Sequence, residues 1–200
     1  MNDRTFIDSY FIDQKKILDT IAKDKIEKVI ALLFEAWKEK RRIFIIGNGG
    51  SASTATHFAA DLNKTSIVEG KPRFKAMALV DNVPWVSALI NDEGFENLFV
   101  EQLKHFFEPG DVLIGISVHG GSGKDKAGLW SQNLLKAIQY VKDRQGVTIG
   151  LSGFDGGAMR DCADVCVIVP MNSTPHVESF HVTLEHLIVN CLKAKIQDYA

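Results

Sequence analysis

Five short apolar runs that alternate with amphipathic stretches restrict the fold of this chain more than any other feature. The runs span residues 42–47, 74–80, 111–117, 146–152 and 165–170. Helices are predicted at 51–63, 84–107, 124–144 and 176–198. Strands that alternate with helices of this length indicate a parallel sheet, and strands that are apolar throughout indicate helices on both faces. We therefore predict an α/β fold, a three-layer sandwich around a parallel five-stranded sheet.

Residues 1–40 precede this alternation and have a helical pattern of their own. Apolar residues recur at near-helical spacing at Phe6, Tyr10, Ile17 and Ile21, and again from Ile26 to Trp37. The length of 200 residues, without a linker or an internal repeat, predicts one domain over 1–200. Within it we expect N-terminal helices at 1–40 and an α/β core at 41–200. Apolar faces exposed on these helices would favour oligomerisation.

The composition excludes several classes of protein. The formal net charge is −2, with acidic and basic residues interspersed, so no nucleic-acid partner and no membrane surface is expected. No stretch approaches the roughly 18–20 apolar residues of a membrane span, and the N-terminus lacks the apolar core of a signal peptide. The three cysteines form no CxxC pair, although metal ligation by Cys162 and Cys166 is an alternative to a strand entry. We expect a cytoplasmic protein.

A glycine-rich loop, GNGGSAS, follows the first predicted strand at residues 47–53. Glycines allow a ligand to approach the backbone, and a helix that begins near Ser51 offers free N–H groups to an anion. Candidate substrate-binding residues here are Asn48, Gly49, Gly50 and Ser51. The loop fits neither the Walker A pattern nor the dinucleotide pattern GxGxxG. A phosphate site is one interpretation, and a tight turn with a serine N-cap is the other.

A second loop of this kind follows the third predicted strand. Residues 115–126 read GISVHGGSGKDK and contain Ser117 and Ser122 before another predicted helix. Two loops of Ser and Gly at the ends of neighbouring strands can converge on one anion. Because no nucleotide-binding acid or magnesium motif accompanies them, we expect a phosphorylated small molecule and no nucleotide cofactor.

The loop and helix after the second predicted strand contain polar residues that could bind sugar hydroxyl groups. These candidates are Asp81, Asn91 and Asp92. Asp and Asn are also the usual residues of caps and turns, so a purely structural role is the alternative.

Two predicted helices carry titratable side chains at helical spacing. His57 and Asp61 lie four residues apart and share a face. The last helix holds Glu178, His181, Glu185 and His186, and on a helical wheel the two glutamates are only about 20° apart. Such a set could bind zinc or a similar ion, or could act as a general acid–base pair without a metal.

These motifs together resemble a known family. The patterns GNGGSxSxxxHFAxDL, NDxGFxNLF, GDVLIGIS and SGFDGGAM, with a late helix ending in His, are similar to the flavodoxin-like SIS (sugar isomerase) fold and to bacterial phosphoheptose isomerases. The resemblance covers nearly the whole chain. It implies an aldose–ketose isomerase for sedoheptulose 7-phosphate and D-glycero-D-manno-heptose 7-phosphate, a seven-carbon sugar of cell-surface lipopolysaccharide. It also implies a homotetramer in which neighbouring subunits complete each active site.

The resemblance also implies roles for individual residues. It assigns one divalent ion per subunit, Zn²⁺, to four ligands: His57, Asp61, Glu178 and His186. It assigns catalysis through an enediol to Asp61 and His186. Phosphate binding falls on Ser51, Ser117 and Ser122, and hydroxyl binding on Asn91 and Asp92. Glu178 is a candidate for substrate binding as well as for the metal. The resemblance therefore favours Glu178 over Glu185 as the metal ligand.

The chain departs from the family pattern in four places. Asp61 stands where the family has Glu, and Glu178 where it has Gln. The usual Ser-Thr-Ser after the third strand is here Ser117-Val118-His119, with His119 a further candidate for substrate binding. The segment 123–133 is longer, so Lys124 or Lys126 could compensate at the phosphate.

These departures leave alternatives to the heptose phosphate isomerase. One is an isomerase for another phosphosugar or a sugar-sensing regulator, although the chain has no helix-turn-helix appendage. Another is the non-catalytic branch of the fold that binds the replication initiator. That branch lacks the acidic residue and the late histidine, which are present here as Asp61 and His186.

Overall fold

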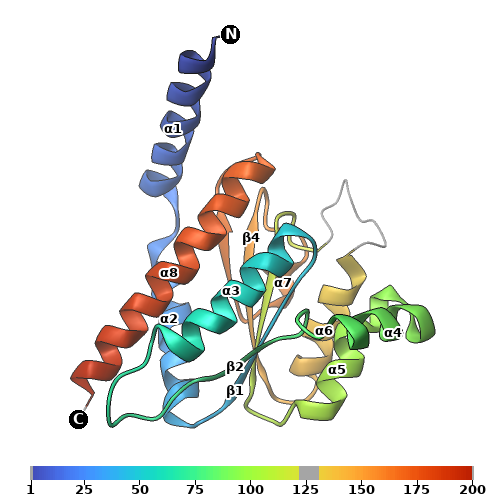
Figure 1. Ribbon diagram of the computed structural model, residues 1–200. Coiled ribbons are helices and arrows are strands. Elements are labelled where there is room, and N and C mark those ends of the chain that lie inside the picture. Colours follow the sequence, from blue (N-terminus) through green and yellow to red (C-terminus); the bar gives the residue numbers. More distant parts are fainter. Residues whose placement is uncertain (1, 122–130, 200) are drawn as a thin grey trace.

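The computed structural model describes residues 2–121 and 131–199 and contains the expected parallel five-stranded sheet. Its strands are β1 Arg42–Gly47, β2 Lys75–Ala78, β3 Val112–Ser117, β4 Val147–Gly153 and β5 Val165–Val169. All neighbouring strands pair in parallel, in the order β2-β1-β3-β4-β5 (Figure 1). The carboxyl ends of the strands therefore meet at one edge of the sheet, where ligands of open α/β folds bind.

Helices cover both faces of the sheet, which confirms the three-layer prediction. Along β1, Ile43 and Ile45 point to one face and Phe44 and Ile46 to the other, as the two-residue period of a strand requires. The first pair packs with α2 Lys23–Lys38, α3 Gly50–Lys64 and α8 Thr174–Asp198. The second pair packs with α5 Leu98–Phe106, α6 Gln132–Lys142 and the short α7 Met159–Cys162.

The single helix predicted over 84–107 was wrong. The structure has α4 Val83–Glu93, a 3-10 turn η1 Phe95–Asn97, and then α5. The break falls at Gly94, whose φ of 85° ends α4, because a left-handed residue cannot continue a right-handed helix. The strand predicted at 74–80 is shorter than expected. The helix predicted at 124–144 lies partly outside the described residues, and its described part is α6.

The N-terminal helix α1 Asp3–Thr20 extends away from the sheet (Figure 1). Ile17 is its only fully buried side chain. Its exposed apolar side chains are Phe6, Ile7, Phe11, Ile12 and Leu18. Tyr10 holds α1 to the start of α8 by stacking on His176, with ring centroids 4.0 Å apart. None of the helices in the described part of the chain is long and apolar enough to cross a membrane.

Candidate active site

A cavity of about 180 Å³ lies at the carboxyl ends of β1 and β3. Its polar lining residues are Asn48, Ser51, Ser117, His119, Ser131 and Glu178. We call this cavity the cradle. Ser51 and Ser117 are nearly buried, with 4% and 9% of their surface exposed. Hydroxyl groups at the start of a helix form the kind of site that binds a phosphate.

The loop before α3 brings the helix N-terminus to the cradle. A side chain at Gly47 would collide with the backbone of Ser51, because an added Cβ would lie 2.5 Å from its carbonyl oxygen. Gly49, with φ of 56°, turns the chain into α3. Asn48 is held from behind by Asn133, and the two side-chain amides exchange hydrogen bonds of 3.1 and 2.9 Å. The close approach to α3 and the hydrogen bonds to Asn133 therefore fix the position of the loop.

Four titratable side chains meet where α3 packs against α8. His57 and Asp61 come from α3, and Glu185 and His186 come from α8. The Oδ2 atom of Asp61 lies 3.0 Å from Nδ1 of His186 and 3.8 Å from Nε2 of His57. The other oxygen of Asp61 accepts a 2.8 Å hydrogen bond from the Thr65 hydroxyl. Thr65 thus fixes the carboxylate with one oxygen toward both histidines.

Glu185 is the buried member of this group. Its side chain is fully buried, whereas about half of each histidine is exposed. Oε1 of Glu185 lies 2.7 Å from Nδ1 of His57. Burial and, to a smaller extent, the neighbouring charge of Asp61 raise the pKa of Glu185 to about 8. A charged carboxylate in this buried position is stable only beside a positive group.

The group fits a divalent metal ion. One ligand atom from each of the four side chains lies within 4.8 Å of all the others. Within the described residues, Oε2 of Glu185 makes no hydrogen bond, and Oε1 has the 2.7 Å contact with Nδ1 of His57. Two imidazoles with two carboxylates suit zinc and related ions. The four side chains could hold such an ion, which would polarise a carbonyl group of a bound substrate.

Comparison with known proteins identifies the family. The SIS domain matches residues 9–153. The phosphoheptose isomerase of Helicobacter pylori (strain ATCC 700392 / 26695) is 35% identical over 171 residues, which cover 86% of this chain and 84% of that protein. This chain belongs to the SIS-domain phosphoheptose isomerase family.

Two further proteins are similar to this chain. The lincomycin biosynthesis protein LmbN of Streptomyces lincolnensis is 40% identical over 180 residues, which cover 88% of this chain but only 64% of LmbN. The structure of phosphoheptose isomerase GmhA from Neisseria gonorrhoeae superimposes with a TM-score of 0.82 at 26% identity and covers 96% of both chains. The fold of this chain is thus that of a phosphoheptose isomerase.

Three of the four metal ligands that the resemblance implies lie together in the structure. Glu185, and not Glu178, joins His57, Asp61 and His186. Glu178 lies over the first turn of α3, since an added Cβ on Gly50 would be 2.5 Å from its Oε1 atom. The four-residue group therefore does not include Glu178, which stays a predicted metal ligand.

Other predicted residues are distributed unevenly around this site. Asn91 and Asp92 lie on α4, exposed to solvent, where the Asn91 amide donates a 2.7 Å hydrogen bond to Asp92. Neither residue lines the cradle or the hollow beside His57. Ser122 and Lys124 lie outside the described residues.

Ser131 is a cradle residue that the sequence interpretation missed. It lines the cavity with Ser51 and Ser117 and stands at the N-cap of α6. The signal was present, because a serine directly before an amphipathic stretch is a typical helix start. The sequence alone favours Ser122, which follows the strand more closely.

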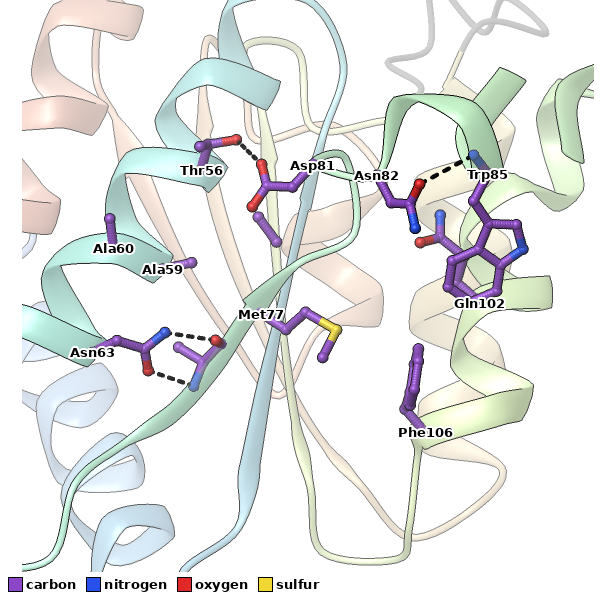
Figure 2. A pocket seen from close by; sticks show the side chains of 12 residues that line it. Thr56, Ala59, Ala60, Asn63, Met77, Asp81, Asn82, Trp85, Gln102 and Phe106 are labelled. Carbon is purple, nitrogen blue, oxygen red and sulfur yellow. Dashed lines mark hydrogen bonds between the residues drawn. The ribbon is translucent and has the colours of Figure 1, made fainter. Parts of the chain in front are cut away.

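A larger cavity of about 460 Å³ lies on the other side of α3, beside the edge strand β2 (Figure 2). Asp81 points into this cavity and accepts a 2.6 Å hydrogen bond from the Thr56 hydroxyl. Asn63 pairs with both backbone groups of Ala76 and so covers part of the free edge of β2. The cavity has neither a histidine nor a cationic side chain in its lining, so it lacks the chemistry of the active site. Asp81 thus does not line the cradle.

Proposed function

We propose that this protein is an aldose–ketose isomerase that interconverts sedoheptulose 7-phosphate and D-glycero-D-manno-heptose 7-phosphate. The observation that carries the proposal is the 3.0 Å contact between Asp61 and His186, beside His57. Glu178 lines both the cradle and the hollow that contains His57. The contact supplies a base and an acid, and the cradle supplies a phosphate site. The similarity to proteins named phosphoheptose isomerase supports the substrate. The reaction serves the synthesis of heptose for cell-surface polysaccharide.

The phosphate group anchors the open-chain sugar in the cradle. The hydroxyls of Ser51, Ser117 and Ser131 donate hydrogen bonds to its oxygens, together with the N–H groups at the start of α3. His119 lines the same cavity and packs on Phe154, with ring centroids 4.2 Å apart. This anchoring holds the carbonyl end of the sugar beside the four titratable side chains of α3 and α8, which reduces the entropy cost of the reaction.

Asp61 and His186 move the protons. Oδ2 of Asp61 takes the proton from the carbon next to the carbonyl, and the resulting enediol receives it on the neighbouring carbon. His186, hydrogen-bonded to the same oxygen atom, exchanges a proton with the sugar oxygens. Zn²⁺, if bound by the titratable group, would stabilise negative charge on the carbonyl oxygen. Thr65 keeps Asp61 in one orientation during these steps.

The test is turnover of sedoheptulose 7-phosphate by the purified protein, with and without a chelator and with added Zn²⁺. We expect conversion that stops in chelator and returns with zinc. Replacing His186 by Ala should abolish turnover without unfolding the protein, because this side chain is about half exposed. An unaltered protein that converts no sedoheptulose 7-phosphate under any of these conditions would refute the proposed substrate.

We also propose that the protein acts in the cytoplasm as a homo-oligomer, a tetramer with active sites at subunit interfaces. Five large apolar side chains on α1 are between 47% and 65% exposed. Exposed apolar surface of this kind often marks a contact with another protein chain. The three cysteines are free, as in a reducing compartment. Light scattering of the purified protein tests the number of subunits, and a monomer would contradict it.

A further inference from the structure

The loop that follows β4 packs an aromatic ring against a side chain of the cradle. We propose that Phe154, in this loop, is a positioning residue: it holds the imidazole of His119 at the wall of the cradle, where a ring N–H group donates a hydrogen bond to the substrate phosphate. Phe154 does not line the cradle itself, so it acts through His119. The inference rests on the proposed function, because it assigns a part of the phosphate site.

His119 differs in its chemistry from the other side chains of the cradle. Among the described residues that line this cavity, it is the one side chain that can carry a positive charge, while Glu178 contributes a carboxylate. A phosphate bound beside a carboxylate needs donors on its other sides to offset the repulsion. An imidazole can donate such a hydrogen bond in its neutral and in its charged form. The position of this ring therefore affects how tightly the cradle binds a phosphate.

The ring of Phe154 limits the orientations that this imidazole can adopt. The two ring centroids are 4.2 Å apart, with an angle of 44° between the ring planes. Aromatic rings at this separation attract one another, and a protonated imidazole is attracted more strongly. Both side chains are half-buried, at the edge of the cavity. A side chain that is ordered before the ligand arrives loses less conformational entropy when it binds.

The backbone of Phe154 has a conformation that is costly for a phenylalanine. Its φ is 54°, in the left-handed region. The other described non-glycine residues with positive φ are Lys40 and Gln145, which lie just beyond the caps of α2 and α6, where this conformation is common. Phe154 ends no helix and directly follows β4. Strain of this kind persists where the surrounding structure imposes it, and it is concentrated at functional sites.

The loops after β3 and β4 are joined on both sides of the two rings. The N–H group of Gly153, directly before Phe154, donates a 2.9 Å hydrogen bond to the carbonyl oxygen of Val118, directly before His119. Beyond the rings, Gly157 touches the backbone of His119, because an added Cβ on this glycine would collide with the carbonyl oxygen of His119. The backbone that carries each ring is therefore held in place, and the rings meet in one arrangement.

The test is a double-mutant cycle with Phe154→Leu, His119→Ala and the double variant. Affinity for inorganic phosphate is measured by isothermal titration calorimetry on metal-free protein. We expect each single variant to weaken phosphate binding about five- to tenfold, and the double variant to bind no more weakly than His119→Ala. Phe154→Tyr retains the ring and should bind phosphate as the unaltered protein does. In steady-state kinetics, Phe154→Leu should raise KM for sedoheptulose 7-phosphate and leave kcat nearly unchanged.

Phe34→Leu is the matched control. Phe34 lies on α2, is half-buried like Phe154 and packs on the same part of the apolar core, but does not line the cradle. This variant should bind phosphate as tightly as the unaltered protein, which separates the role of Phe154 from a general loss of packing. Circular dichroism checks folding. If Phe154→Leu does not fold, Phe154→Asn takes its place, because asparagine tolerates the left-handed region.

Three results would overturn the inference: unchanged phosphate affinity in Phe154→Leu, losses in the two single variants that add up in the double variant, or no phosphate binding by the unaltered protein. The titration needs no turnover. An unaltered protein that binds phosphate but converts no sedoheptulose 7-phosphate would refute the proposed substrate, and the titration would still decide the role of Phe154.

Discussion

Acid should destabilise this protein through a histidine that takes no part in the active site. His181 lies on α8 and is fully buried. Its Nε2–H group donates a 3.2 Å hydrogen bond to the carbonyl oxygen of Ser152, and Nδ1 has no partner within the described residues. A proton on Nδ1 would therefore bury an uncompensated charge. Burial lowers the pKa of His181 from 6.5 to about 4.

The direction of the effect follows from the two pKa values. Above pH 6.5 the imidazole is neutral in both the folded and the unfolded chain, so it has no effect on stability. Between pH 6.5 and 4 only the unfolded chain binds the proton, and the free energy of unfolding falls as the pH falls. At about 1.4 kcal/mol per pH unit, the loss is about 2 kcal/mol at pH 5 and about 3 kcal/mol below pH 4.

Urea unfolding at pH 7.5 and pH 5.0 measures this loss in metal-free protein. Other groups also titrate over this range, so the quantity of interest is the difference between the unaltered protein and His181→Gln. Glutamine can donate to Ser152 and has no charge at either pH. We expect the variant to lose about 2 kcal/mol less stability on acidification than the unaltered protein. His105→Gln, at an exposed histidine, is the control and should show no such difference. Equal losses in His181→Gln and the unaltered protein would refute the reasoning.

Three further predictions concern the active site. Thr65→Val should lower kcat for sedoheptulose 7-phosphate about tenfold with little change in KM, because Asp61 loses its orienting hydrogen bond, and Thr65→Ser should restore it. Asn133→Leu should cost about 2 kcal/mol and lower Tm by about 4–8 °C in a thermal melt, since both hydrogen bonds between the amides of Asn133 and Asn48 are lost in a half-buried position. Ser131→Ala should raise KM several-fold and leave kcat nearly unchanged, and an unchanged KM would remove it from the cradle.

The sheet and the cradle could be predicted because local patterns determine them. The apolar runs predicted five parallel strands, and the structure has them. The glycines after β1 and β3 predicted a binding site at the carboxyl ends of these strands, where the cradle lies. Gly94 shows where such reasoning fails. The amphipathic pattern continues across it, so the pattern alone predicts one helix. The left-handed φ of 85° at Gly94 is a property of one residue that divides this segment into α4 and α5.

The cradle serines show a second limit. Ser117 is the last residue of β3 and Ser51 lies in the first turn of α3, close behind β1, so their positions follow from the sheet. Ser131 lies 14 residues beyond Ser117, and sequence alone does not tell which serine of such a segment reaches back to the strand ends. The start of α6 decides this, because it packs on the sheet through its own apolar face.

The two glutamates of α8 differ in a way that helical periodicity cannot detect. Glu178 and Glu185 are about 20° apart on the helical wheel, so both point toward α3. They differ in their position along the axis of α8, because each lies opposite a different turn of α3. Glu178 meets α3 at Gly50, whereas Glu185 meets it at His57, seven residues later. The same spacing of seven residues in both helices therefore brings one glutamate to the cradle and the other to the group of His57, Asp61 and His186.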